Sequence, residues 1–349
     1  MATASLVVGG TQRKAKVRLG PLVERVLGYV ILALVAVWLV ANVVADPDRF
    51  LGSLLVGLQN GMLYALVALG YTMVYGIIEL INFAHGDVYT LGTFFSLAIL
   101  TLLGVTGIVT GPMLIVVVAV TILGAMLLCG LTGVIIERLA YRRLRNAPKL
   151  APLITAIGMS FILENLMLYW RGPSPVPFPQ VIPNPQFALG AVSIQSKQVI
   201  VILLAVVLMI VLQTFVTRTR LGKAMRATAQ DKDAAQLMGI DINTTIALTF
   251  LIGSALAGAA GFVSGVYYGS TWFFNGFAAG LKAFTAAVLG GIGNLAGAML
   301  GGFLIGLVEA MTTQFIGDQW SNVLVFTVLV LVLIFRPSGL LGESLPNKV

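Results

Sequence analysis

The sequence predicts an all-α protein that crosses a membrane many times. Hydrophobic residues make up 58% of the 349 positions and charged residues only 10%, and the mean hydropathy is +1.00. A soluble protein of this length needs far more charge to cover its surface. Apolar runs long enough to cross a bilayer core of about 30 Å recur along the chain. The alternating ten-residue segments of an outer-membrane barrel are not visible in the sequence.

The first apolar run predicts a transmembrane helix over 25–45, after a basic N-terminal segment over 1–24. This run is longer than the roughly 7–15 apolar residues of a signal peptide, so we expect a retained anchor helix, with cleavage as the alternative. The remaining residues, 46–349, are expected to form one membrane domain. Its spans are predicted at 50–75, 88–106, 111–136, 150–170, 198–217, 244–269, 295–316 and 320–335.

The positions of the basic residues predict the orientation of these spans. Seventeen of the 21 Lys and Arg residues fall in 1–25, 137–149, 218–232 and the C-terminal tail. Because cytoplasmic loops carry an excess of Lys and Arg, both termini are expected in the cytoplasm. The number of crossings is then even, and the nine apolar runs require a tenth.

We assign the tenth crossing to a short apolar run at 281–294, which ends in Gly290, Gly291 and Gly293. This run is too short for an ordinary span. Irregular backbone at membrane depth is tolerated where it packs against protein or lines a cavity. We therefore expect a broken or half-spanning helix here, and about nine to ten transmembrane segments in total.

Two further patterns concern packing. The loop 171–197 holds six of the thirteen prolines, which excludes a continuous helix and predicts an extended extracytoplasmic loop. Small residues repeat at four-residue spacing in two predicted spans, which favours close approach of helix backbones in lipid. The first stripe is Gly253, Ala257, Gly261, Gly265 and Gly269, and the second is Ala298, Gly302, Gly306 and Ala310.

The stretch INFAHGDVY, residues 81–89, places the only histidine of the chain between two apolar runs. We interpret it as a helix break in which Asn82 caps a helix end or turn, Gly86 takes an unusual backbone angle and Asp87 opens the next helix. The alternative is a proton relay through Glu79, His85 and Asp87. Other charges at membrane depth, which need a partner or a function, are Glu164, Lys282 and Glu309.

An intramembrane enzyme is disfavoured. One histidine cannot form a multi-histidine metal site, and neither H-E-x-x-H nor a nucleophile elbow is present. The single cysteine, Cys129, allows no intrachain disulfide and no cysteine-based metal site. We expect no catalytic residue, metal or cofactor in this chain.

The basic segment 218–243 is predicted to be cytoplasmic and contains a short amphipathic part, for which one interpretation is that it lies against the lipid headgroups. It contains Asp233, Ala234 and Ala235, then three residues, then Gly239. This pattern resembles the EAA-x3-G motif of ABC importer permeases, in which a short cytoplasmic helix docks into a cleft on the ATPase. Aspartate stands in place of the glutamate, and the downstream Ile-x-Leu-Pro is absent.

Five other stretches resemble, in order and spacing, the permease of branched-chain amino acid ABC uptake systems. They are YALVALGYTMVYGIIELINFAHGDVYTLGTF (64–94), IERLAYRRLR (136–145), LITAIGMS (153–160), KAFTAAVLGGIG (282–293) and RPSGLLG (336–342). The resemblance covers about 50–349, and residues 1–46 fall outside it.

The resemblance implies a pore subunit in the bacterial plasma (inner) membrane. Its partners would be membrane lipids, a homologous second permease, two ATPase subunits and an extracytoplasmic binding protein that delivers Leu, Ile or Val; a nucleic-acid partner is not expected. No G-x4-G-K-[ST] is present, so ATP and Mg would bind to the partner ATPase. The alternatives are a urea or short-amide permease and, from another class, a stand-alone channel or proton-coupled carrier.

A zwitterionic aliphatic cargo needs a mostly apolar path with donors for its carboxylate. Discontinuous helices offer such donors at their ends, so Gly290, Gly291 and Gly293 are predicted to lie on the pathway, together with Asn82 and His85. The aromatic residues Tyr267, Tyr268, Trp272, Phe273 and Phe274 are interpreted as an interfacial belt, with an outer gate as the alternative.

Overall fold

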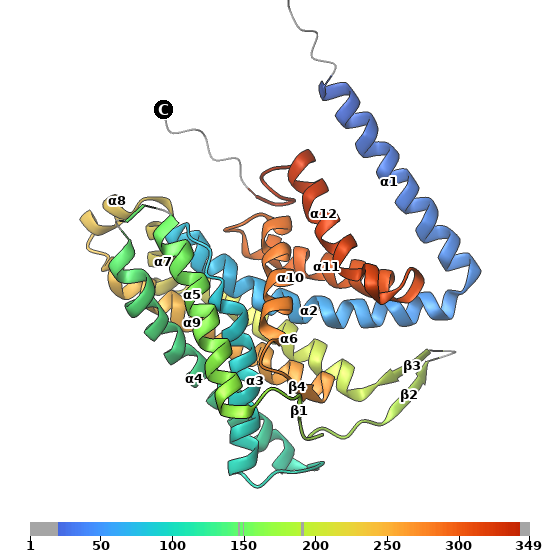
Figure 1. The fold of residues 1–349 in the computed structure, drawn as a ribbon, viewed down its shortest axis with the longest axis horizontal. Helices are drawn as coiled ribbons and strands as arrows, with labels where there is room; N and C mark the ends of the chain where they lie inside the picture. The colour runs from blue at the N-terminus through green and yellow to red at the C-terminus, as the bar shows by residue number, and fades with distance from the viewer. Residues whose placement is uncertain (1–19, 146, 149, 190–191, 343–349) are drawn as a thin grey trace, which may run out of the picture. The chain divides into compact units, whose positions relative to one another are not determined.

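The predicted all-α architecture is confirmed. The computed structural model describes residues 20–145, 147–148, 150–189 and 192–342, so the basic segment predicted at 1–24 lies largely outside the described residues. Ten helices of at least 15 residues run through the described part (Figure 1). They are α1 (Gly20–Ala45), α2 (Pro47–Ile78), α3 (Ala84–Leu102), α4 (Pro112–Ile136), α5 (Leu150–Arg171), α6 (Ser196–Arg218), α9 (Ile242–Tyr268), α10 (Asn275–Gly290), α11 (Leu295–Phe315) and α12 (Ser321–Phe335).

The remaining elements are short. Two small helices, α7 (Arg220–Gln230) and α8 (Lys232–Leu237), join α6 to α9. A π-helical turn (Glu137–Tyr141) and a 3₁₀ turn (Arg142–Leu144) follow α4, and a second 3₁₀ turn (Asp318–Trp320) precedes α12. The proline-rich loop holds β1 (Val176–Pro177), β2 (Gln186–Leu189) and β3 (Val192–Gln195), and β4 (Ser270–Thr271) follows α9. Strand β1 pairs with β4 and β2 pairs with β3, both antiparallel.

Eight helices of the described chain are long and apolar enough to cross a membrane: α1, α2, α4, α5, α6, α9, α11 and α12 with the turn before it. Helix α3 has 19 residues and lies at 84–102 rather than at the predicted 88–106, because it starts directly after the helix break. Helix α10 has 16 residues and is about 24 Å long, short of a full span. It begins at Asn275, six residues before the expected start.

The chain divides into two units after Pro47. Helix α1 makes up the described part of the first unit, and its 26 residues include the predicted span 25–45. The assignment of 25–45 as a retained anchor and of 46–349 as one permease domain stays a prediction.

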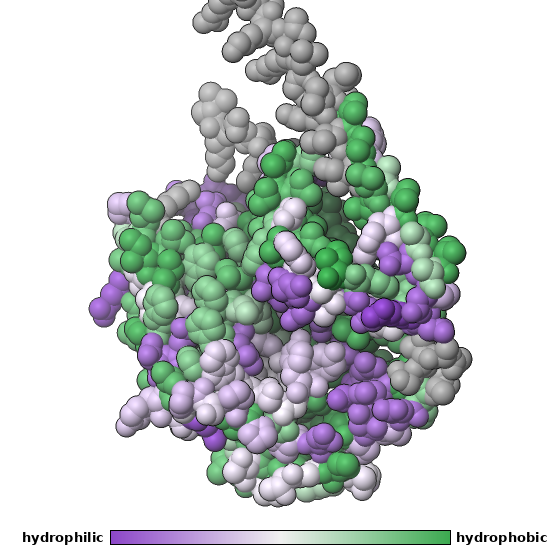
Figure 2. All heavy atoms as spheres, turned by 45° about the vertical axis from the view of Figure 1, so that its right-hand side comes forward, coloured by the Kyte–Doolittle hydropathy of each residue, from purple (hydrophilic) through white to green (hydrophobic). Residues whose placement is uncertain are grey.

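Within the second unit, α3, α4, α5 and α9 lie side by side, and α10 packs against α3 and α11 (Figure 1). Most of α2 and α9 is buried, whereas α4, α5 and α6 expose large apolar side chains such as Leu123, Phe161 and Ile210. Figure 2 shows broad hydrophobic patches on the outer surface. In water such patches promote association, whereas lipid tails cover them at no cost, as a membrane-spanning bundle requires.

Both stripes of small residues form close helix contacts, but the prediction is wrong for Gly269. That residue follows the end of α9 with φ of +67°, and a Cβ atom there would meet nothing within 4 Å. A Cβ atom placed on Gly302 of α11 would lie 2.5 Å from the backbone of Ala65 on α2. A Cβ atom on Gly261 of α9 would lie 2.5 Å from the carbonyl oxygen of Tyr89 on α3. Real Cβ atoms do not approach other atoms so closely, so glycine is what allows these backbones to touch.

Candidate functional site

The predicted helix break lies at residues 79–83, between α2 and α3. The expectation that Asn82 caps a helix is wrong: no side chain caps α3, and the Asn82 Oδ1 accepts a hydrogen bond from the Tyr141 hydroxyl at 3.2 Å. The expectation of an unusual angle at Gly86 is also wrong, because Gly86 lies within α3 and does not have positive φ. In the helix break it is Glu79 that has positive φ, at 57°. Gly86 is needed for packing instead, since a Cβ there would lie 2.9 Å from the Gly280 Cα of α10.

His85 and Asp87 lie in the first turn of α3, and each is 1% exposed. The His85 ring packs edge-on against Tyr71, with the ring centroids 4.8 Å apart. Neither of its nitrogens lies within hydrogen-bonding distance of a carboxylate among the described residues. Asp87 instead accepts a hydrogen bond from the Ser160 hydroxyl at 2.5 Å. Hydrogen bonds therefore do not link Glu79, His85 and Asp87 into a relay.

The glycine break predicted after the short helix lies between α10 and α11. Gly291 and Gly293 have φ of +106° and +93°, values that favour glycine. The carbonyl oxygens of Leu289 and Gly290, left free by the end of α10, accept hydrogen bonds from the backbone N–H groups of Leu340 and Leu341 at 2.8 and 2.9 Å. The RPSGLLG segment thus satisfies this helix end, as helix termini require.

Neighbours of two predicted pathway residues, Asn82 and His85, lie close to α10. Phe83, next to Asn82, and Tyr71, which contacts His85, both lie close to Phe284 of α10, with ring centroids 6.2 and 6.1 Å apart. The glycine break lies at the C-terminal end of the same helix. The assignment of these residues to a translocation pathway stays a prediction.

The segment 218–243, called here the coupling segment, folds into α7 and α8. The Asp231 carboxylate caps α8 by accepting hydrogen bonds from the backbone N–H groups of Asp233 and Ala234, both at 3.0 Å. Two backbone hydrogen bonds end the helix. The Gly239 N–H donates to the Gln236 carbonyl oxygen, and the Ile240 N–H donates to the Ala235 carbonyl oxygen. These bonds and the φ of +84° at Gly239 form a Schellman end, in which glycine is strongly preferred.

The end of α8 presents apolar side chains to solvent. Ala235 is buried against the bundle, whereas Leu237 and Met238 are 88% and 83% exposed. Two adjacent large apolar residues this exposed, on a short rigid turn, are suited to insertion into a partner's groove.

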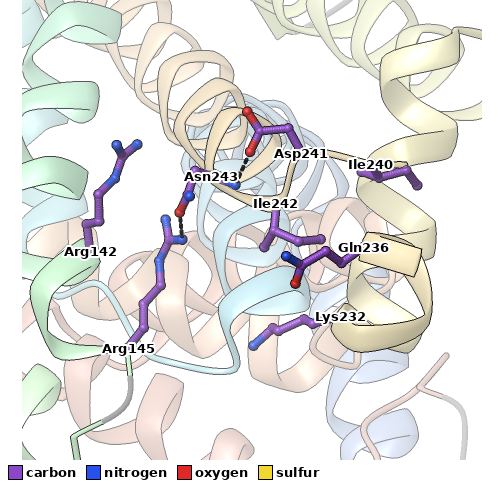
Figure 3. A pocket seen from close by; sticks show the side chains of 8 residues that line it. All are labelled: Arg142, Arg145, Lys232, Gln236, Ile240, Asp241, Ile242 and Asn243. Carbon is purple, nitrogen blue, oxygen red and sulfur yellow. Dashed lines mark hydrogen bonds between the residues drawn. The ribbon is translucent and has the colours of Figure 1, made fainter. Parts of the chain in front are cut away.

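A cleft of about 340 Å³ lies beside the coupling segment (Figure 3). Its lining includes three cations, Arg142, Arg145 and Lys232, and one acid, Asp241. A hydrogen bond from the Thr244 hydroxyl at 2.5 Å, with two from backbone N–H groups, lowers the pKa of Asp241 below its ordinary value. Burial lowers the pKa of Arg145, against the opposing effect of Glu137. The excess of positive charge favours an acidic partner.

Glu137 holds the basic wall of this cleft in place. Its carboxylate is 0% exposed and accepts hydrogen bonds from Arg142, at 3.1 and 3.3 Å, and from Arg145. Arg142 follows Glu137 by five residues, and the π-helical turn between them brings the two onto one face. This triad was not predicted, because an ordinary helix would pair residues three or four apart.

A second cavity, of about 330 Å³, lies beside the turn between α9 and α10 and is called here the outer pocket. Lys282 of α10 and Glu309 of α11 face it and form an ion pair, with Nζ and Oε1 2.6 Å apart. The sequence marks both as charges at membrane depth but gives no sign of their pairing, since they are 27 residues apart. The Lys282 ammonium also lies 5.9 Å from the ring centroid of Tyr64.

The predicted aromatic group lies around the outer pocket. Tyr268 lines it, and Trp272, Phe273 and Phe274 pack on one another at the start of α10. The Trp272 indole donates a hydrogen bond to the Pro173 oxygen at 2.6 Å, which ties the proline-rich loop to this turn. Both a belt and a gate are compatible with this position.

Sequence comparison places the chain among known transport proteins. The family described as branched-chain amino acid transport system / permease component matches residues 53–333. The chain is 43% identical, over 305 residues, to the high-affinity branched-chain amino acid transport system permease protein BraD of Pseudomonas aeruginosa, covering 86% of this chain and 98% of BraD. The identity and coverage are the same for LivH of Escherichia coli K12.

Two more distant relatives extend this picture. A probable branched-chain amino acid transport permease protein of Methanocaldococcus jannaschii is 26% identical, over 82% of this chain and 91% of its own. The permease protein LivM of Escherichia coli K12 is 30% identical over 44% of this chain and 36% of its own. No solved structure matches the chain significantly. The chain belongs to the family of permease components of branched-chain amino acid transport systems.

Proposed function

We propose that this chain is the permease subunit of an ATP-driven importer for aliphatic amino acids of the Leu, Ile and Val type. It works in the bacterial inner membrane with both termini in the cytoplasm. A homologous second permease, two ATPase subunits that bind ATP and Mg, and an extracytoplasmic binding protein complete the transporter. The observation that carries the proposal is the 43% identity to BraD over 98% of that relative's length.

The proposal is tested by reconstitution in liposomes. The chain, purified with its partner subunits, is expected to accumulate radiolabelled leucine only when ATP and the loaded binding protein are both present. Uphill uptake by the chain alone would overturn the proposal in favour of a proton-coupled carrier. Uptake of urea or acetamide without uptake of leucine would assign the cargo to the short-amide class.

We place the contact with the ATPase on the coupling segment. Asp233, Ala234, Ala235 and Gly239 set the shape of α8, and its exposed apolar tip faces away from the bundle. The neighbouring cleft adds a cationic surface. Apolar anchors with a polar rim around them are typical of protein–protein interfaces.

Asn82, His85, Gly290, Gly291 and Gly293 are proposed to belong to the inner part of the pathway. Their support is that they lie next to one short helix in the sequence or in the structure. Gly86, the residue after His85, packs against α10, and the glycine break follows the end of the same helix. A helix that ends within the protein is suited to moving when the ATPase moves.

Replacing Gly239 by valine is expected to reduce copurification of the ATPase about tenfold. The φ of +84° lies in the left-handed region, where a β-branched residue costs about 1–2 kcal/mol, so the Schellman end is lost and the apolar tip moves. Copurification from detergent extracts measures the effect.

Asparagine at the same position is the matched control. It tolerates the left-handed region, and a Cβ atom at Gly239 meets no other atom within 4 Å, so a larger side chain causes no clash. Gly239→Asn is therefore expected to retain most of the ATPase. Equal loss in both variants, or none in either, would contradict the role assigned to this turn.

A further inference from the structure

The two charges that face the outer pocket have unused hydrogen-bonding capacity. The Glu309 Oε1 accepts the hydrogen bond from Lys282, whereas its Oε2 is buried with no partner among the described residues. The Lys282 ammonium carries three donors, and the structure assigns one of them to Glu309. Both side chains are mostly shielded, with 13% and 14% exposed.

A buried ion pair of this kind carries a large desolvation cost unless further hydrogen bonds satisfy its remaining donors and acceptors. Attraction between two buried charges offsets their desolvation only when further hydrogen bonds satisfy the remaining lone pairs and protons. Within membrane spans, ionisable residues that face a cavity mark the routes of substrates and ions. An ion pair with free capacity, facing a cavity, therefore points to a ligand that carries both charges.

The outer pocket has the size and lining for a small amphipathic ligand. Its volume of about 330 Å³ is at the small end of the range for ligand sites, about 300–1,000 Å³. Part of its lining is apolar and comes from Leu63 and Val67 of α2 and from Ala278 and Ala279 of α10. On its buried floor the Tyr89 hydroxyl donates to Ser264 at 2.5 Å.

The rim of the pocket is on the side away from the coupling segment. Tyr268, Ser270 and Asn275 line the pocket and are exposed, while the floor is buried. Helix α9 begins beside the coupling segment and ends at Tyr268, about 40 Å further along its axis. In the proposed orientation, the pocket therefore opens toward the binding protein.

We propose that the outer pocket binds the zwitterionic head of a free aliphatic α-amino acid in transit, with its carboxylate on Lys282 and its ammonium on Glu309. The side chain of the ligand lies against the apolar lining residues. This inference rests on the proposed function and adds to it a site on the permease itself.

The charges of the pocket explain which ligands it accepts. Lys282 and Glu309 sum to zero, so a zwitterion inserted between them leaves every charge paired. An anion or a cation of the same shape leaves one protein charge unpaired in a poorly hydrated cavity, which is costly. A neutral amide or urea carries no charge, so it makes neither the contact with Lys282 nor the contact with Glu309 that a zwitterion makes.

Competition binding tests the site directly. The purified transporter in nanodiscs, without the binding protein, is expected to bind radiolabelled leucine. Leucine methyl ester, which lacks the carboxylate, and 4-methylpentanoate, which lacks the ammonium, compete at least about tenfold more weakly, as expected for loss of a charged hydrogen bond.

A change of one charge is expected to change the preferred ligand. Glu309→Gln leaves the pocket with a net positive charge, so leucine binding falls about tenfold and 4-methylpentanoate becomes the better competitor. Lys282→Met has the opposite effect and favours the methyl ester. A misfolded variant cannot show such a gain, so folding defects do not mimic this result.

The exchange variant Lys282→Glu/Glu309→Lys separates binding from structure. It preserves an ion pair but reverses the direction in which the zwitterion lies, so leucine uptake is expected to stay at least about tenfold below that of the wild type. Recovery of uptake by the exchange variant would show that the pair is only structural and would overturn the inference. Glu164→Gln, which removes another buried membrane carboxylate outside the pocket, is the matched control and retains uptake.

The test also distinguishes this inference from the proposed function. Normal leucine uptake by both single variants, with an unchanged order of competitors, overturns the pocket and leaves the importer in place. Absence of ATP-dependent leucine uptake by the wild-type transporter overturns the importer and the inference together.

Discussion

A chain carrying Gly302→Leu is expected to fail to fold or to melt far below the wild type. Gly302 is where α11 touches α2, and a Cβ atom there would lie 2.5 Å from the N and Cα of Ala65. The clashing atoms belong to the backbone of Ala65, which cannot avoid the new side chain by changing rotamer. Overpacking of a core typically costs about 1–3 kcal/mol, and we expect at least the upper value here. Thermal unfolding of the detergent-purified chain measures it.

Gly158→Leu is the matched control for this prediction. It introduces the same side chain on α5, where a Cβ atom meets nothing within 4 Å and the residue is exposed. Leucine also favours a helix over glycine by up to about 1 kcal/mol, so the control is expected to melt no lower than the wild type. Equal melting of the two variants would show that contact between α2 and α11 does not limit stability.

The positions of the helices were predictable from sequence because length and apolar composition are sufficient to mark a span. Three helices begin four to six residues before their predicted starts: α1 at Gly20, α3 at Ala84 and α10 at Asn275. In α3 and α10 the apolar signal weakens at the start of the helix. Helix α3 begins with a histidine and an aspartate in its first turn, so the apolar pattern starts later than the helix. Helix α10 begins among the aromatic residues of the α9–α10 turn, where periodicity does not mark the first residue.

The site was less predictable because its groups come from distant parts of the chain. The sequence identified Asn82, Lys282 and Glu309 as unusual, but their partners depend on packing. Asn82 pairs with a tyrosine 59 residues away, and Lys282 pairs with a glutamate on the next helix. The coupling segment was found because its motif is local, and local chemistry also sets its shape: an aspartate cap at one end and a glycine at the other.

The role of Gly86 shows a different limit. Glycine after an asparagine and a histidine suggests a turn, where its freedom of φ is useful. In the structure Gly86 is helical and serves close packing against Gly280 of α10. Sequence alone does not distinguish these two uses of glycine, since both require only the absence of a Cβ atom.

Replacing Glu137 by glutamine is expected to destabilise the chain by about 2 kcal/mol or more and to reduce ATPase copurification. Loss of one partner from a fully buried pair costs about 3–5 kcal/mol. The side chains of Arg142 and Arg145 are 37% and 21% exposed, so water offsets part of that cost. Both arginines line the cleft beside the coupling segment, so their release also disturbs the proposed docking surface. Thermal unfolding and copurification are the two measurements.

Two comparisons separate the ion triad from a general effect of charge. Arg138→Gln removes an exposed charge from the same turn and is expected to change the free energy of unfolding by less than about 0.5 kcal/mol. Adding Arg142→Gln to Glu137→Gln leaves only one guanidinium without its carboxylate, so part of the lost stability returns while copurification stays low. If the double variant is less stable than the single one, the arginines are held by contacts other than Glu137. In that case the π-helical turn, and not the buried carboxylate, fixes the wall of the cleft.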